Sequence, residues 1–311
     1  MFIRSVKIKL AQSALITKRA DNMTAVFRET SLRSMDYRHR NLIGQNFDGM
    51  DLTNANFSGA NLSGCSFKGA NLTAADFSKT RLRDANLHSA ILDRTNLSGA
   101  DLRNADITGT DCEQTKFNGA RLNEADFTAA HFYKADLSRA DAGGASFKRS
   151  FIINTDMHKT ILRNCDFTSA TMSDTDLEDA DIKKAVFEFG FLQKMSFEKL
   201  DLEDVVFEGA NLTGASFKNT DLKNAIFTSA NLSSAQMQHC IISQATFHEA
   251  WMKNANLAGA NMEGARMINA RLTRANLIGA NIDDTDFSGS DVKWASLEKG
   301  LVADFKGAKR R

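Results

Sequence analysis

The chain has 311 residues, with 39 Lys or Arg against 38 Asp or Glu, so its formal net charge is +1. Hydrophobic residues make up 42% of the chain, too many for a disordered protein, and the charge balance argues against nucleic-acid binding through net charge. No apolar run reaches the roughly 18 residues of a membrane-spanning helix. The chain contains no proline. Because proline cannot donate to a strand ladder, its absence favours a fold of stacked ladders.

Residues 1–24 precede the regular pattern. Ile3, Val6 and Leu10 would share one face of a helix, whereas Val6, Ile8 and Leu10 would alternate in a strand. Either element would cap the first coil of a repeat fold. Charges interrupt the apolar residues, unlike in a secretory signal, so the expected location is the cytoplasm. An effector that is secreted through another kind of N-terminal signal is the alternative.

A five-residue repeat occupies residues 25–296. Every fifth residue from Phe27 to Val302 is apolar, which gives 56 positions without an insertion. The unit is a small residue, Asn or Asp, a large apolar residue and two variable residues, as in Ala55-Asn56-Phe57-Ser58-Gly59. Of the 19 glycines, 15 occupy the fifth position, where a chain that turns a corner needs backbone freedom. We therefore expect the small and the large apolar residue to point inward and the other three to point outward.

Phenylalanine prefers every second repeat, so each coil should hold an even number of repeats, and four repeats close a square. The repeat resembles the pentapeptide-repeat family over about nine-tenths of the chain. The resemblance implies an all-β fold, a right-handed parallel β-helix of about 14 four-sided coils with short N- and C-terminal caps. With about 4.8 Å between strands, the rod would be roughly 65 Å long.

Several positions depart from the repeat. Met195, Leu200 and Val205 replace the small inward residue in three successive repeats. They predict either a locally wider or bent core or a kink that shapes a partner site. Arg40 and Gln45 break the same rule near the N-terminus, which predicts a frayed or capped first coil.

The last segment, 297–311, has apolar residues at helical spacing before a basic tail. They are Leu297, Leu301, Val302 and Phe305. We expect a short capping helix or a homodimer contact at this end.

The sequence carries no recognisable catalytic motif. The four cysteines fall on inward positions and are predicted to be core thiols: Cys65, Cys112, Cys165 and Cys240. The six histidines are scattered over different columns, and there is no phosphate loop, nucleophile elbow or His-Glu-x-x-His motif. We therefore expect no enzyme, no metal and no cofactor.

Function should then reside on the outer faces. Sorting outward residues into columns 20 apart gathers aromatic and basic residues on one face, a composition that suits a protein or nucleic-acid interface. The candidate partner-binding residues are Tyr133, Phe151, Phe191, Lys194, Trp251, Lys253 and Trp294. Lys134, Arg271, Arg274 and Lys293 share this face with Asp174 and Asp291. Local covering of the core by the aromatic rings is the alternative interpretation.

Two further columns are candidates. Val186, Val206 and Ile226 form an apolar strip in adjacent coils, which predicts either a contact surface or plain ladder packing. An acidic column consists of Asp181, Asp201 and Asp221 with Glu203 and Asp204 beside it. Nearby lysines favour a solvated face of mixed charge for this column.

The leading hypothesis is a non-catalytic scaffold that binds a protein partner through the aromatic–basic face or the apolar strip. The alternative comes from the resemblance, because members of the family protect DNA gyrase or another topoisomerase from quinolone-type antibiotics as acidic rods that imitate DNA. The acidic column would serve that role. However, residues 25–296 carry a net charge of only −6, far from a continuous phosphate-like stripe.

Overall fold

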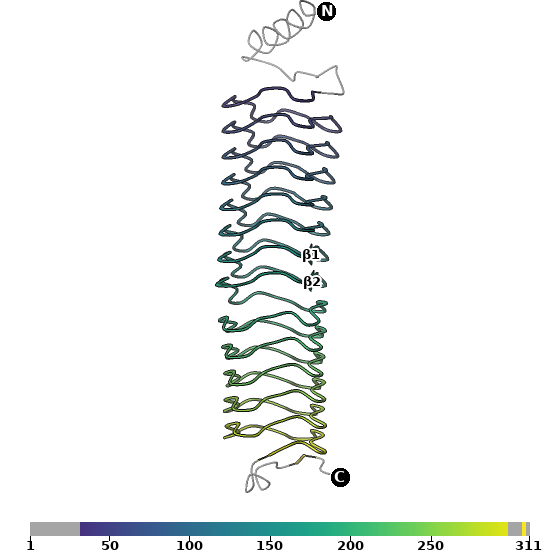
Figure 1. Ribbon diagram of the computed structural model, residues 1–311, viewed down its shortest axis with the longest axis vertical. Coiled ribbons are helices and arrows are strands. Elements are labelled where there is room, and N and C mark those ends of the chain that lie inside the picture. Colours follow the sequence, from purple (N-terminus) through teal and green to yellow (C-terminus); the bar gives the residue numbers. More distant parts are fainter. Residues whose placement is uncertain (1–31, 298–306, 309–311) are drawn as a thin grey trace, which may run out of the picture.

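The computed structural model describes residues 32–297 and 307–308, and residues 32–297 form a right-handed, four-sided parallel β-helix (Figure 1). Parallel bridges join each coil to the next at residues 20 apart, as between Asn56 and Asp76. One contact widens into two three-residue strands, β1 (Phe151–Ile153) and β2 (Thr171–Ser173), with Phe151 opposite Thr171. The predicted coil length is confirmed, and the described repeats amount to about 13 coils.

The structure describes neither the predicted N-terminal segment 1–24 nor most of the predicted C-terminal segment 297–311. The capping elements and the dimer contact expected there lie outside the described residues. Near the start of the described part, Arg40 is exposed and Gln45 is only half-buried. These two inward positions are less buried than their counterparts beyond Phe47, but bridges such as Asp36–Asn56 join the first described coil to the next. The frayed or capped first coil stays a prediction. None of the described residues belongs to a helix long and apolar enough to cross a membrane.

Most repeats turn their corner through a hydrogen-bonded β-turn. The carbonyl of the central residue accepts the N–H three residues on, as from Ala55 to Leu52 at 2.9 Å. The fifth residue of the repeat has a positive φ at all 53 turns from Ser34 to Trp294, and 38 of these residues are not glycine. Glycine is thus favoured at this corner but not required. No β-branched residue occupies it in the described part, because such side chains are strongly disfavoured at positive φ.

The Asn or Asp of each repeat supports the same corner. Its side-chain oxygen accepts the backbone N–H two residues on, as from Ser58 to Asn56 at 3.0 Å. This local bond is the Asx geometry that makes these residues favourable in turns. It explains why Asn and Asp are the commonest residues directly before the large apolar residue.

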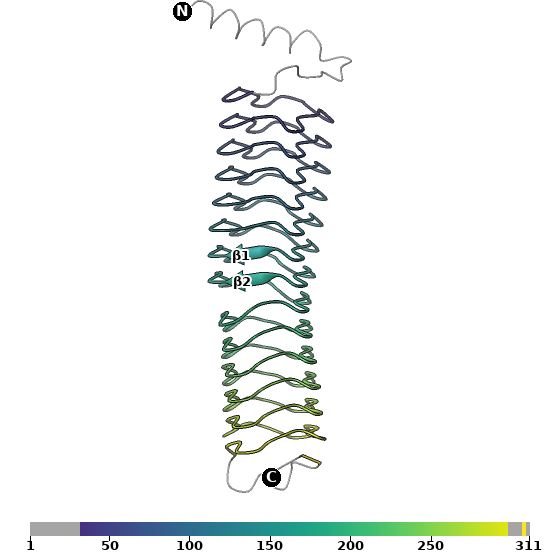
Figure 2. The same ribbon diagram turned by 90° about the vertical axis from the view of Figure 1, so that its right-hand side faces the viewer.

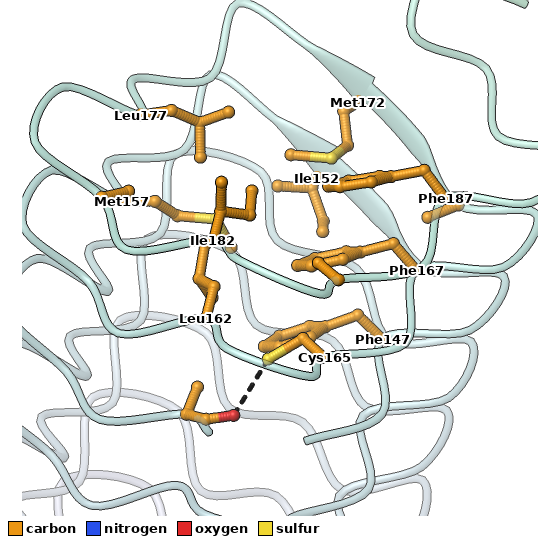
Figure 3. Close-up of a cluster of buried hydrophobic side chains, with 14 of the residues drawn as sticks. Phe147, Ile152, Met157, Leu162, Cys165, Phe167, Met172, Leu177, Ile182 and Phe187 are labelled. Atoms are coloured by element: carbon orange, nitrogen blue, oxygen red, sulfur yellow. Dashed lines mark hydrogen bonds between the residues drawn. The ribbon is translucent and has the colours of Figure 1, made fainter. Parts of the chain in front are cut away.

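The core is a set of side-chain ladders along the rod. Seven phenylalanines stack one per coil, with successive ring centroids 4.7 to 5.2 Å apart. They are Phe127, Phe147, Phe167, Phe187, Phe207, Phe227 and Phe247. Figure 3 shows Phe147, Phe167 and Phe187 in one stack beside the aliphatic residues of the other columns. Each buried central side chain stabilises the fold by about 1.5–3 kcal/mol before entropy is subtracted.

Small polar residues at inward positions are satisfied by the neighbouring coil. The Thr95 hydroxyl donates to the Leu72 carbonyl at 2.8 Å. The Cys165 thiol donates to the Ala142 carbonyl at 3.0 Å, the dashed line in Figure 3. Thr or Cys can therefore replace Ala in the core without leaving a buried polar group unpaired.

The ladder is interrupted once in the middle of the rod. No bridge joins Asp176 to Ser196 or Asp181 to Asp201, although the other two faces of the same coils are bridged at Thr171–Phe191 and Val186–Val206. Among the described backbone groups, the N–H of Leu177, Ile182, Ser196 and Asp201 also lack the inter-coil bonds that their equivalents make. The break follows β2 along the chain (Figure 2). We call this opening, between residues 174–182 and 193–201, the seam.

The bulky inward residues explain where the seam lies. Met195 and Leu200 directly precede the two unbridged positions, Ser196 and Asp201. Both are buried where most other coils hold the smaller Ala, Thr or Cys, so they place more side-chain volume in the core at this level. Val205 is smaller, and the bridge after it is intact. The structure thus shows an opened ladder at this departure, and a kink that shapes a partner site stays a prediction.

Candidate functional site

The aromatic and basic residues predicted to share a face do share one. A continuous series of bridges runs from His131 through Phe151, Thr171 and Phe191 to Trp251 and on to Asp291. The fourth and fifth positions of the same repeats, beyond the inward central residue, hold Tyr133, Lys134, Lys194, Lys253 and Trp294. The face is not one continuous aromatic surface, however, because Asn211 and Asn231 separate Phe191 from Trp251.

The N-terminal part of this face is a small aromatic group. The rings of His131 and Phe151 meet edge to face at 5.0 Å, and the Lys134 ammonium lies 5.0 Å from the ring centroid of Tyr133. Phe191 is exposed two coils beyond Phe151, with Thr171 between them. These contacts cover the rings partly with the protein's own side chains.

The C-terminal part of the face is more highly organised. The Arg271 guanidinium lies 4.2 Å from the ring centroid of Trp251, and that of Arg274 lies 5.5 Å from the ring centroid of Trp294. The two arginines belong to one repeat, and their tryptophans belong to the coils before and after it. Together with the flanking lysines they form what we call the Trp–Arg face: Trp251, Lys253, Arg271, Arg274, Lys293 and Trp294.

The tryptophans remain open to a partner in spite of these stacks. Trp251 is 49% exposed and Trp294 is 73% exposed. Stacking of this kind is worth about 0.5–1 kcal/mol at an exposed site, enough to orient a guanidinium but not to bury it. Each arginine is thus held over a ring with its N–H edge available to an acceptor.

A groove of about 600 Å³ runs along the corner beside Trp251. Its floor and walls come from corner residues of four successive coils and from the adjoining Trp–Arg face. The lining includes Ser229, Glu249, Trp251, Asn269, Arg271, Gly289 and Asp291. Gly289 has a φ of +72°, and a Cβ there would lie 2.2 Å from the Asn269 Oδ1. Glycine at this corner therefore leaves room for the Asn269 side chain at the groove.

The cations of the Trp–Arg face have no acidic partner among the described residues. None of Lys253, Arg271, Arg274 and Lys293 forms an ion pair within the described coils, whereas Arg83 and Lys148 pair with carboxylates at 2.7 and 2.9 Å. Asp291, the acidic residue next to Arg271 in the ladder, makes hydrogen bonds to other groups. Its carboxylate accepts the Lys293 N–H at 3.1 Å and the Thr273 hydroxyl at 3.3 Å.

Sequence reasoning found this face but missed its organisation. Arg271 and Arg274 could be placed on the face from their spacing, but their pairing with Trp251 and Trp294 could not. The groove residues Glu249 and Asn269 were missed because they lie on a corner, although the successive spacings of 20 from Glu249 to Asn269 and from Asn269 to Gly289 place all three in one column.

The predicted apolar strip is present but modest. Val186, Val206 and Ile226 are neighbours in the ladder. Only Ile226 is exposed, and the two valines are half-buried by their neighbours. Ladder packing accounts for the strip, whose role as a contact surface stays a prediction.

The acidic column is interleaved with cations. Arg163 pairs with Asp181, and the Lys183 ammonium lies 2.7 Å from Asp201 and 3.2 Å from Glu203. Hydrogen bonds to Asp201 and then to Glu203 raise the pKa of Lys183, which keeps it charged. Asp201 and Asp221 are ladder neighbours, and Asp204 accepts the Asn224 amide at 3.0 Å. The seam separates Asp181 from Asp201, so the column is not a continuous acidic stripe.

One group of described residues has the composition of a metal site. Asp156, His158 and Asp176 place one potential ligand atom each within 4.8 Å of one another. The His158 Nδ1 already lies 2.7 Å from the Asp156 Oδ1, which also accepts the His158 backbone N–H at 3.0 Å. Asp176 is the ladder neighbour of Asp156, so the turn and the ladder together account for this group, which is at least partly exposed.

Comparisons with known proteins agree with the geometry of the coils. The family model "Pentapeptide repeat region" matches residues 46–117 and 200–277, and "Pentapeptide repeats (8 copies)" matches residues 105–141 and 152–188. No curated protein matches the chain.

Several solved structures are similar. HetL, a pentapeptide repeat protein involved in heterocyst differentiation regulation from the cyanobacterium Nostoc sp. strain PCC 7120, is 25% identical, with 88% of this chain and 93% of HetL covered and a TM-score of 0.23. A pentapeptide repeat protein of the Arabidopsis thaliana thylakoid lumen is 37% identical over 36% of this chain and 74% of its own, with a TM-score of 0.28. Full-length QnrB1, a plasmid-mediated fluoroquinolone resistance protein, is 16% identical over 88% of this chain and 97% of its own, with a TM-score of 0.23. On the matched family models and the coil geometry, the chain belongs to the pentapeptide-repeat family.

Proposed function

We propose that the protein is a non-catalytic scaffold that binds a protein partner through the Trp–Arg face. The observation that carries this proposal is the arrangement of two exposed tryptophans, each stacked with an arginine that has no acidic partner among the described residues. Trp and Arg are the residue types that contribute most to binding energy at protein interfaces. A stiff rod also presents them in fixed positions, which lowers the entropy cost of binding.

The absence of catalysis and the cytoplasmic location are parts of the same proposal. The four cysteines are free and buried, which suits a reducing compartment. Burial also keeps them from acting as nucleophiles, because a thiol must ionise to react.

A capture experiment tests the scaffold. The immobilised protein is exposed to a cell extract alongside two variants, Trp251→Ala/Trp294→Ala and Ile241→Ala. Ile241 is 42% exposed on another face, half a coil along the chain from both Asn231 and Trp251, and serves as the matched control. We expect one protein to be retained by the wild type and by Ile241→Ala but lost from the double variant. Equal retention by all three forms would contradict the proposal.

A second candidate is topoisomerase binding by imitation of DNA at the acidic column. The stacking of Asp201 on Asp221 favours it, whereas the ion pairs of Lys183 weaken it. A gyrase supercoiling assay with and without a quinolone separates the two candidates. Protection that Asp201→Lys abolishes would support this candidate, and the absence of any effect at micromolar protein would reject it.

A further inference from the structure

We propose that the Trp–Arg face takes an extended acidic segment of its partner, with carboxylates received by Arg271 and Arg274. This inference rests on the proposed function and names the chemistry of the partner. Lys253 and Lys293 flank the two arginines, so the face presents four positive charges against two nearby carboxylates, Asp291 on the face and Glu249 at its corner.

The two guanidinium groups are oriented so that they can bind carboxylates. A guanidinium stacked on an indole keeps its plane fixed, and its N–H edge can then donate two parallel bonds to one carboxylate. Arg271 is the better placed, at 4.2 Å from Trp251 and on the wall of the groove. No ion pair joins Arg271 to the Asp291 carboxylate in the described coils, and that carboxylate instead accepts the Lys293 backbone N–H and the Thr273 hydroxyl.

The groove fits an extended chain. Ser229, Glu249, Asn269 and Gly289 mark the same corner in four successive coils, each about 4.8 Å from the next. That length of about 14 Å corresponds to roughly four residues of extended chain. Alternate side chains of such a segment would face the rod, so an acidic residue among them would meet Arg271 on the wall of the groove. Arg274 lies at the next corner of the same face, where it would receive a carboxylate beyond the groove.

Charge argues for a protein segment over nucleic acid. Residues 25–296 carry a net charge of −6, and carboxylates such as Glu249 border the groove. Nucleic-acid binding depends on neutralising many phosphates along a track, and four cations surrounded by an acidic rod do not provide one. A short acidic peptide needs only the local charge.

Trp251 and Trp294 are the only two tryptophans of the chain, so intrinsic fluorescence reports on this face without a label. The probe is a synthetic peptide of alternating Glu and Ser, and the control peptide has Gln in place of Glu. We expect a saturable change in tryptophan emission with the Glu peptide alone. Affinity should fall at least tenfold in Arg271→Gln/Arg274→Gln and fall steeply with added salt. Single Trp→Phe variants assign the signal to each ring.

Arg81→Gln is the matched control variant. Arg81 lies in a second groove of about 400 Å³ that holds His39 and Lys79 but no aromatic carbocycle, and its removal should leave the peptide affinity unchanged. An equal response to the Gln peptide, or tighter binding of a short DNA duplex at the same tryptophans, would overturn the inference. If capture of a partner depends on Trp251 and Trp294 while the acidic peptide does not bind, this inference fails and the proposed function stands. If capture does not depend on Trp251 and Trp294 either, both this inference and the proposed function fail.

Discussion

Asp181 and Asp201 occupy equivalent positions in successive coils, yet no backbone bridge joins them. The pairs directly before and after them in the same column, Ile161–Asp181 and Asp201–Asp221, are bridged. Leu177, Ala180 and Leu200 beside this gap are 3–7% exposed, whereas most core residues are at 0–1%. Two faces of the rod are therefore open at the seam while the other two hold the coils together.

The seam should be the most labile point within the rod. We expect the amides of Leu177, Ile182, Ser196 and Asp201 to exchange hydrogen faster than their equivalents two coils away, because they lack the inter-coil bonds. Replacing the two bulky inward residues, in Met195→Ala/Leu200→Ala, should restore the inter-coil bonds and slow this exchange at least tenfold. Hydrogen exchange read by mass spectrometry or NMR checks it.

Val205→Ala is the control for the seam. Val205 is also oversized for its position, but the bridge at Val206 is intact. Its replacement should leave exchange at the seam unchanged. Slow exchange of the four amides in the wild type would show that the seam is closed in solution.

A charge placed in the core should destroy the rod. Ala215 is fully buried at an inward position between the coils of Met195 and Ala235. Ala215→Arg combines overpacking with an unpaired buried charge, and the expected loss is about 4 kcal/mol or more in the free energy of unfolding. Circular dichroism recorded during thermal unfolding measures this loss of stability.

Asn219→Arg provides the comparison in the same coil. Asn219 is exposed at a corner with a φ of +56°, and Arg already occupies such corners at Arg94, Arg139 and Arg274. Its melting temperature should stay within a few degrees of that of the wild type. If Ala215→Arg melts at the same temperature as Asn219→Arg, the inward assignment is wrong.

The period of five, the four-sided coil and the inward positions could all be predicted from the sequence, because each repeat uses the same local geometry. The seam could be predicted only in part. Met195 and Leu200 identified the place, but which inter-coil bonds break depends on how the neighbouring coils relax around them. The pairing of Arg274 with Trp294 was beyond prediction for a similar reason. Surface rotamers are set by the coil above and the coil below and not by the repeat.

The Asp93 carboxyl should make the fold less stable as pH rises. Burial raises its pKa, and the neighbouring Asp111 and Glu113 raise it further. A carboxyl whose folded pKa exceeds its unfolded value stabilises the fold when protonated, and this stability is lost as pH rises through the folded pKa. Asp93→Asn should therefore raise the melting temperature at pH 7, and the gain should vanish below about pH 4.

Asp51→Asn should have the opposite sign. The Thr53 hydroxyl lowers the pKa of Asp51, so its ionised form stabilises the fold above the unfolded pKa of about 3.9. Thermal melts of both variants at pH 3.5 and pH 7 make the comparison. A melting temperature of Asp93→Asn at or below that of the wild type at pH 7 would contradict the assignment of Asp93.

The cysteines should be inert in the folded protein. Burial raises the pKa of Cys65 to about 11 and that of Cys112 and Cys240 to about 12, and it also raises the pKa of Cys165. All four thiols therefore stay protonated near neutral pH, and they are inaccessible to reagents as well. We expect an aromatic disulfide reagent at pH 8 to label none of them in native protein and all four in denaturant. Of the four, Cys165 lies nearest the seam in the chain, so labelling of Cys165 ahead of the others under mild destabilisation would indicate that the rod opens there first. Fast labelling of Cys65 or Cys240 in native protein would contradict the packing of the core.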